Sequence, residues 1–150
     1  MWHGTLVAIN LPIMFALNQY TILALRILAG LIFVWSGFGH ARDPEGSSKD
    51  LGLPKPIVLL VGIVELLAGL GIAGGLLTRL SAVGLMIVML GAMHRKAFVW
   101  HSGFWGKGSQ GWHYDLLLFL IALLVFATNG GEWTIDRLLF GSQAASSYIL

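Results

Sequence analysis

Two charged residues, Arg26 and Glu65, lie within long uncharged stretches of the sequence. A carboxylate withdrawn from water can exchange a proton with a bound substrate, and a guanidinium beside it can neutralise its charge. Glu65 follows Gly62 by three residues and precedes Gly69 by four, so it shares a helix face with residues small enough for close packing. Such a face is expected to point into a helix bundle.

The positions of Arg26 and Glu65 leave two interpretations open. Measured from the Tyr20 and Leu77 ends of their helices, which share one membrane face, Arg26 lies about 9 Å deep and Glu65 about 18 Å deep. Two extended side chains come close to bridging that difference. The first interpretation is a buried ion pair that fixes the register of two helices. The second is that Glu65 is a proton carrier beside a bound substrate such as a quinone.

The histidines form a second group of candidate residues. His40, His94, His101 and His113 fall near the ends of apolar stretches, which an up-and-down topology brings to one membrane face. With nearby acids such as Asp115 they have the chemistry to ligate a metal, hold a b-type haem or bond a quinone carbonyl. Histidines at helix ends are more often interfacial polar residues, and the sequence has no H-E-x-x-H spacing. We therefore predict no metal site.

From this group we select His40, His94, His113 and Asp115 as candidate contacts for a quinone or another ligand. A bound quinone would be held without a covalent bond. Because the sequence has no cysteine, disulfides, iron–sulfur clusters and covalently attached c-type haem are excluded within this chain.

The composition indicates that lipid is the solvent. Of the 150 residues 57% are hydrophobic and 11% are charged, whereas an ordinary soluble domain has about 25% charged residues. So few polar groups cannot cover the surface of a soluble fold. The net charge is only +2, without a run of lysines and arginines, so a nucleic-acid partner is excluded.

Four apolar stretches are candidates for crossing a bilayer, which takes about 20 helical residues. They comprise residues 20–39, 57–77, 80–93 and 116–128, the last extending to about 112–130. The third is short and needs Arg79 and Arg95 to reach the two interfaces with their long side chains. We predict an all-α, up-and-down transmembrane four-helix bundle.

The remaining segments divide the chain. Residues 1–19 form an apolar leader, either an interfacial helix or a signal-like segment; without a basic start or a small-residue cleavage site, we keep it in the mature chain. Residues 20–137 form the membrane domain and residues 138–150 a C-terminal tail. Residues 41–56 are expected to form a polar loop. The connection at 94–115 contains three of the six tryptophans and is expected to lie in the membrane interface.

The distribution of positive charge predicts an orientation. Six lysines and arginines fall in the first and third connections and two in the second turn and the tail: Arg42, Lys49, Lys55, Arg95, Lys96 and Lys107 against Arg79 and Arg137. Cytoplasmic loops are enriched in positive residues. We therefore expect the first and third connections in the cytoplasm and both termini outside.

Several short segments together resemble the DoxX family of small four-helix membrane proteins. The resemblance covers about residues 22–137. It rests on Arg26 with Gly30 and Gly37, on Glu65 and the following L-L-A-G, on G-L-L-T-R at 75–79, and on Gly130, Gly131, Thr134, Ile135 and Asp136. Members often have lysine at the position of His40. The resemblance implies association with respiratory and sulfur redox chemistry, including subunits of thiosulfate:quinone oxidoreductase.

Three functions follow from the residues and the resemblance. The favoured one is an accessory or anchoring subunit of a respiratory or photosynthetic redox complex, with Glu65, Arg26 and His94 lining a quinone site. The alternatives are a free-standing quinone-reducing oxidoreductase of the thiosulfate type and a purely structural packing subunit. Small size and the lack of cysteine favour a non-catalytic subunit over an enzyme. The expected surroundings are a bacterial or archaeal cytoplasmic membrane and other membrane subunits.

Overall fold

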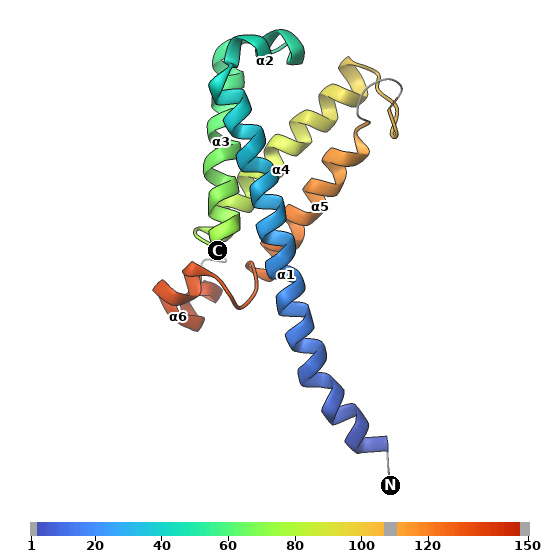
Figure 1. Cartoon of the computed structure of the whole chain (residues 1–150), viewed down its shortest axis with the longest axis vertical. Coiled ribbons are helices and arrows are strands. Elements are labelled where there is room, and N and C mark those ends of the chain that lie inside the picture. The colour runs from blue at the N-terminus through green and yellow to red at the C-terminus, as the bar shows by residue number, and fades with distance from the viewer. Residues whose placement is uncertain (1–2, 107–110, 148–150) are drawn as a thin grey trace.

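The computed structural model describes residues 3–106 and 111–147. Side chains are described for residues 14–106 and 111–141. Helices dominate this part of the chain (Figure 1). In chain order they are α1 (His3–Arg42), α2 (Pro44–Leu51), α3 (Lys55–Gly74), α4 (Thr78–His94), the π-helical turn η1 (Arg95–Val99), α5 (His113–Thr128) and α6 (Ile135–Ser147). Lys107 and residues 148–150 lie outside the described residues.

Four of these helices form a bundle, which confirms the predicted fold class. Helix α1 packs against α3 and α5, α3 packs against α4, and α4 packs against α5. Segments Met14–Arg42, Lys55–Gly74 and Thr78–Val99 are long and apolar enough to cross a membrane. The third exceeds the predicted 80–93 because η1 continues α4.

Helix α5 has only 16 residues, yet it follows α4 from end to end. The Lys96 ammonium contacts Asp115 at one end of the pair, and the Arg79 guanidinium lies 5.3 Å from the centre of the Phe126 ring at the other. The two antiparallel helices therefore reach similar depths, as an up-and-down bundle requires.

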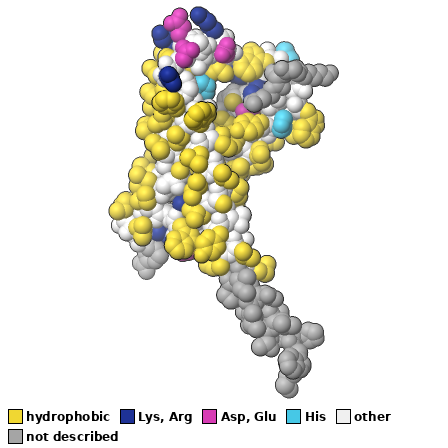
Figure 2. Space-filling view, viewed as in Figure 1, with side chains coloured by type: hydrophobic (Ala, Val, Ile, Leu, Met, Phe, Trp, Pro, Cys, Tyr) yellow, Lys and Arg dark blue, Asp and Glu magenta, His cyan; other side chains and the backbone are white. Residues whose placement is uncertain are grey.

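The outer surface of the bundle is apolar, as expected of a protein embedded in lipid. Figure 2 shows hydrophobic side chains along its length and charged side chains mainly at its α2 end. Large exposed apolar residues occur on every bundle helix, among them Leu28, Trp35, Leu60, Leu67, Ile87 and Leu117. A water-soluble protein of this size rarely exposes such continuous apolar area.

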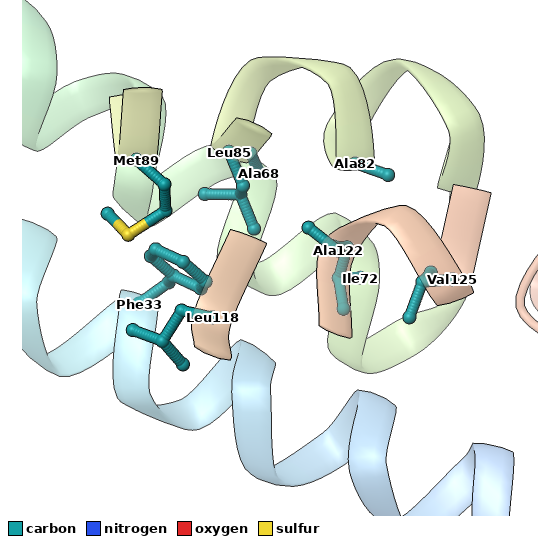
Figure 3. Close-up of a cluster of buried hydrophobic side chains, with 9 residues drawn as sticks. All are labelled: Phe33, Ala68, Ile72, Ala82, Leu85, Met89, Leu118, Ala122 and Val125. Atoms are coloured by element: carbon teal, nitrogen blue, oxygen red, sulfur yellow. The ribbon is translucent and has the colours of Figure 1, made fainter. Parts of the chain in front are cut away.

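The apolar core of the bundle is a small cluster of buried side chains. Figure 3 shows its cluster of nine buried side chains: Phe33 from α1, Ala68 and Ile72 from α3, Ala82, Leu85 and Met89 from α4, and Leu118, Ala122 and Val125 from α5. Lipid tails are as apolar as these side chains, so their cohesion comes from close contact between atoms.

Glycines set the contact between α1 and α3. A Cβ atom added to Gly37 would lie 2.6 Å from the Gly62 carbonyl oxygen, and one added to Gly30 would lie 2.7 Å from the Gly69 carbonyl oxygen. This confirms the close packing expected of the face that Gly62 and Gly69 share with Glu65. Because the two helices are antiparallel, the step of seven residues from Gly37 back to Gly30 on α1 lies alongside the step of seven residues from Gly62 forward to Gly69 on α3.

The glycines of α4 are packed less tightly than these. A Cβ added to Gly84 would make ordinary contact with Val64 at 3.6 Å, and one added to Gly91 would meet nothing within 4 Å. Gly71 does serve packing between helices, since a Cβ added there would collide with the Ser81 side chain of α4. Gly75 adopts a left-handed conformation with φ of 72° and terminates α3.

Three segments outside the four predicted spans differ from the sequence predictions. The leader is continuous with the first span, since α1 runs unbroken from His3 to Arg42. Near the end of the leader, the Gln19 side chain accepts a hydrogen bond from the Glu132 amide (2.9 Å). The expected loop at 41–56 contains α2, whose first turn is capped by Asp43, which accepts a hydrogen bond from the Gly46 amide (2.8 Å). The tail contains α6, which is kinked at Gly141.

Candidate functional site

A cleft of about 1030 Å³ lies inside the bundle near its α2 end. Figure 1 shows α4 and α5 diverging there from α1 and α3. Much of the wall is apolar and includes Phe33, Leu60, Val61, Ile87 and Leu118. Two groups of polar side chains enter this cleft from opposite pairs of helices.

The first polar group consists of Ser36, His40 and Glu65. Glu65 on α3 is only 3% exposed, and its Oε2 accepts a hydrogen bond from the Ser36 hydroxyl at 3.0 Å and lies 2.8 Å from His40 Nδ1. Ser36 and His40 are four residues apart on α1 and so share one face. A carboxylate and an imidazole that share a hydrogen bond can exchange a proton, and such a pair can supply a proton to a neighbouring substrate.

The second polar group consists of Lys96 in η1 and Asp115 in α5. Lys96 Nζ donates a hydrogen bond to Asp115 Oδ1 at 3.0 Å and lies 2.8 Å from Oδ2. Their side chains are 14% and 7% exposed. The sequence prediction included Asp115 and counted Lys96 only as a loop charge. The inward direction of Lys96 depends on η1, which hydropathy does not indicate.

Arg95 attaches α2 to the end of α4 near the cleft. Its guanidinium Nη2 donates to the carbonyl oxygens of Leu51 (2.6 Å) and Gly52 (3.2 Å) at the end of α2. It also lies 5.7 Å from the centre of the Trp100 ring. Leu51, Arg95 and Trp100 all line the cleft, so this contact closes part of one side.

The histidines selected from the sequence divide between the cleft and its surroundings. His40 and His94 line the cleft, as does Asp115. His113 lies apart from it, with Nδ1 2.7 Å from the Phe104 carbonyl oxygen. His101 is exposed and has a left-handed backbone with φ of 49°. Of the predicted ligand contacts, His113 is the one that the structure does not bring to the others.

The predicted ion pair between Arg26 and Glu65 is wrong, although both residues are buried. Glu65 packs against Gly37, and Arg26 lies eleven residues earlier on α1, about 16 Å away along the axis. The antiparallel register places Arg26 beside Gly75 at the far end of α3. Arg26 is therefore remote from the cleft and does not line the candidate quinone site.

Arg26 instead joins the closing loop to the bundle. Its guanidinium donates to the Gly130 carbonyl oxygen at 2.8 Å and to that of Trp133. Close by, Asp136 accepts hydrogen bonds from the Leu77 and Thr78 amides at 2.7 and 2.8 Å and from the Thr78 hydroxyl at 2.8 Å. These contacts explain the buried charge without a role in catalysis.

Among the side chains of residues 14–106 and 111–141, no three histidine or acidic groups come together in a way that could hold a metal ion. The cleft presents carboxylate, imidazole, hydroxyl and ammonium groups against an apolar wall. Small-molecule sites commonly combine a mostly apolar surface with a few polar groups that fix orientation.

Comparisons with known proteins agree with this architecture. The DoxX family profile matches residues 21–102. An uncharacterized membrane protein of Mycobacterium tuberculosis is 30% identical over 131 residues, which cover 78% of this chain and 80% of the relative. The inner membrane protein YqjF of Escherichia coli is 32% identical over 127 residues, covering 82% of this chain and 95% of the relative.

A third relative is CatD of Bacillus subtilis, which is named as a candidate oxidoreductase. It is 26% identical over 121 residues, covering 79% of this chain and 86% of the relative. No solved structure matches the chain significantly. The helices, the apolar surface and the family match together show that this chain is an integral membrane protein that belongs to the DoxX family.

Proposed function

We propose that this protein is an accessory subunit of a membrane redox complex and that its cleft binds a quinone. The observation that carries the proposal is a cleft with apolar walls, formed by membrane-spanning helices, into which the Glu65–His40 pair projects. A quinone has an apolar ring and tail with two hydrogen-bond-accepting oxygens. Such a molecule reaches the cleft by diffusion through lipid.

The chemistry assigns separate tasks to this chain and to its partner. Reduction of a quinone to a quinol takes up two electrons and two protons and converts both carbonyls to hydroxyls. Glu65 and His40 are placed to deliver protons, because their side chains share a hydrogen bond at the cleft. A redox-active partner subunit would supply the electrons, as in an assembly that this chain anchors.

A free-standing oxidoreductase is the second candidate, and the name of CatD favours it. In that case the purified chain alone would reduce quinone when given an electron donor such as thiosulfate. A packing subunit would have no quinone-dependent property of its own.

Isolation from the native membrane tests these possibilities. We expect the chain, expressed at its natural level and extracted in mild detergent, to migrate with larger redox subunits and to retain quinone detectable in a solvent extract. Activity in the lone chain would support the free-standing enzyme. Co-migration without bound or titratable quinone would contradict the quinone site and leave a structural subunit.

A further inference from the structure

We propose that Lys96 and Asp115 form a second binding group of the cleft, which recognises the oxygen at one end of a quinone or quinol ring. This inference rests on the proposed quinone site and identifies how the ligand is oriented within it. Lys96 and Asp115 enter the cleft from η1 and α5, whereas Glu65 and His40 enter from α3 and α1.

The local backbone directs Lys96 into the protein. Arg95–Val99 is π-helical, with the Trp100 amide donating to the Arg95 carbonyl oxygen (2.9 Å) and the Ser102 amide to that of Lys96 (2.7 Å). Burying a lysine and an aspartate is costly, and a packed apolar pair would satisfy the fold equally well.

Asp115 has acceptor capacity left beside Lys96. The residue is 5% exposed, and Lys96 Nζ lies 3.0 Å from its Oδ1 and 2.8 Å from its Oδ2. An ionised carboxylate offers about four acceptor sites on its two oxygens, so a single ammonium does not use them all. A quinol hydroxyl donating to this carboxylate would use one of the remaining sites.

Lys96 complements this acceptor with donors. An ammonium group has three N–H donors, so Lys96 can bond a quinone carbonyl while it keeps its bond to Asp115. The pair therefore suits both oxidation states: Lys96 for the carbonyl and Asp115 for the hydroxyl. A para-quinone has oxygens at opposite ends of its ring, one for this pair and one for the Glu65–His40 pair.

The test uses the purified full-length chain in lipid nanodiscs and a short-tailed benzoquinone and naphthoquinone as probes. Trp35 and Trp100 line the cleft, so their fluorescence quenching reports binding. The variants are Lys96→Met/Asp115→Asn, which removes both charges without leaving one unpaired, and Asp115→Asn alone. Lys49→Met is the matched control, since its side chain is 78% exposed.

We expect the double variant to bind quinone about tenfold more weakly or worse, the usual effect of losing a charge-assisted hydrogen bond. Asp115→Asn alone should weaken quinol binding more than quinone binding, a selectivity that general structural damage would not produce. Lys49→Met should bind as the unaltered protein does. Thermal unfolding of each variant verifies its fold.

Two negative results are distinguishable. If the unaltered protein binds quinone and the double variant binds it equally well, the assignment of Lys96 and Asp115 is overturned and the quinone site stands. If the unaltered protein shows no saturable quinone binding, the proposed function fails and this inference fails with it.

Discussion

Glu65 keeps its carboxylate inside the bundle with two bonds from a single neighbouring helix. Ser36 and His40 lie four residues apart on α1, and both contact Glu65 Oε2. A carboxylate hydrogen-bonded to an imidazole is a candidate for proton exchange, because either group can hold or release the proton between them. This arrangement differs from that of Arg26, which is fixed by backbone carbonyl oxygens at the other end of the bundle.

Replacing Glu65 by glutamine separates a proton-carrying role from a structural one. The amide fills the same space and can bond Ser36 and His40, but it cannot release a proton. We expect quinone turnover by the assembled complex to fall at least about a hundredfold, the lower end for loss of a proton-transfer group, with little change in thermal unfolding. Glu45→Gln, at an exposed residue, is the control. Unchanged turnover with a clearly lowered unfolding temperature would make Glu65 purely structural.

At the scale of elements, helix identity could be predicted from the sequence and helix register could not. Each spanning helix satisfies its own backbone hydrogen bonds, so a local hydropathy pattern indicates it. The register of α1 on α3 depends on contacts between Gly37 and Gly62 and between Gly30 and Gly69, which only the folded pair brings together. That is why the burial of Arg26 and Glu65 could be predicted while their pairing was wrong.

Some of the polar residues that line the cleft could also be identified from the sequence, and others could not. His40, His94 and Asp115 were found because ionisable residues at the ends of apolar stretches are conspicuous in a sequence with so few charges. Lys96 was not found, because its direction follows from a π-helical turn. His113 was included on position alone, whereas its ring is turned toward the Phe104 carbonyl oxygen.

The contact between α1 and α3 predicts a sharp difference between two neighbouring glycines. In Gly37→Val the added atoms would collide with the backbone of α3, since even a Cβ lies 2.6 Å from the Gly62 oxygen and the Leu66 nitrogen. We expect a loss of about 1–3 kcal/mol in unfolding free energy, measured by reversible denaturation in detergent. At Gly39 a Cβ meets nothing within 4 Å, so Gly39→Val is the control. An equal loss from both variants would contradict the packing argument.

The junction between α4 and α6 depends on one carboxylate. Asp136 accepts hydrogen bonds from two amides at the start of α4, where the helix itself offers no acceptors. We expect Asp136→Ala to lower the unfolding free energy by about 1–2 kcal/mol, as loss of a helix cap does, and Asp50→Ala, at an exposed residue of α2, to change it little. Hydrogen exchange at Leu77 and Thr78 should accelerate only in the first variant. Unchanged exchange there would show that the cap is dispensable.

At the scale of the whole molecule, most of the charged side chains and the cleft lie at the same end of the bundle. Figure 2 shows the charged side chains gathered around α2 and the nearby connections, and the cleft lies beneath them. Helix α1, with 40 residues, is about 60 Å long, which is twice the thickness of a hydrocarbon core. It therefore extends past the bundle at its N-terminal end, as Figure 1 shows.

The side on which the cleft opens follows from orientation, and the lack of native cysteine makes orientation measurable. Positive charge on the α2 side predicts that this end faces the cytoplasm. Lys49→Cys on α2 and Glu132→Cys on the closing loop replace side chains that are 78% and 44% exposed. We expect a membrane-impermeant maleimide to label Glu132→Cys in intact cells and Lys49→Cys only after the cells are permeabilised, with both labelled in detergent as the control for reactivity. Labelling of Lys49→Cys in intact cells would place the cleft on the outer side, and protons for a bound quinone would then be drawn from outside the cell.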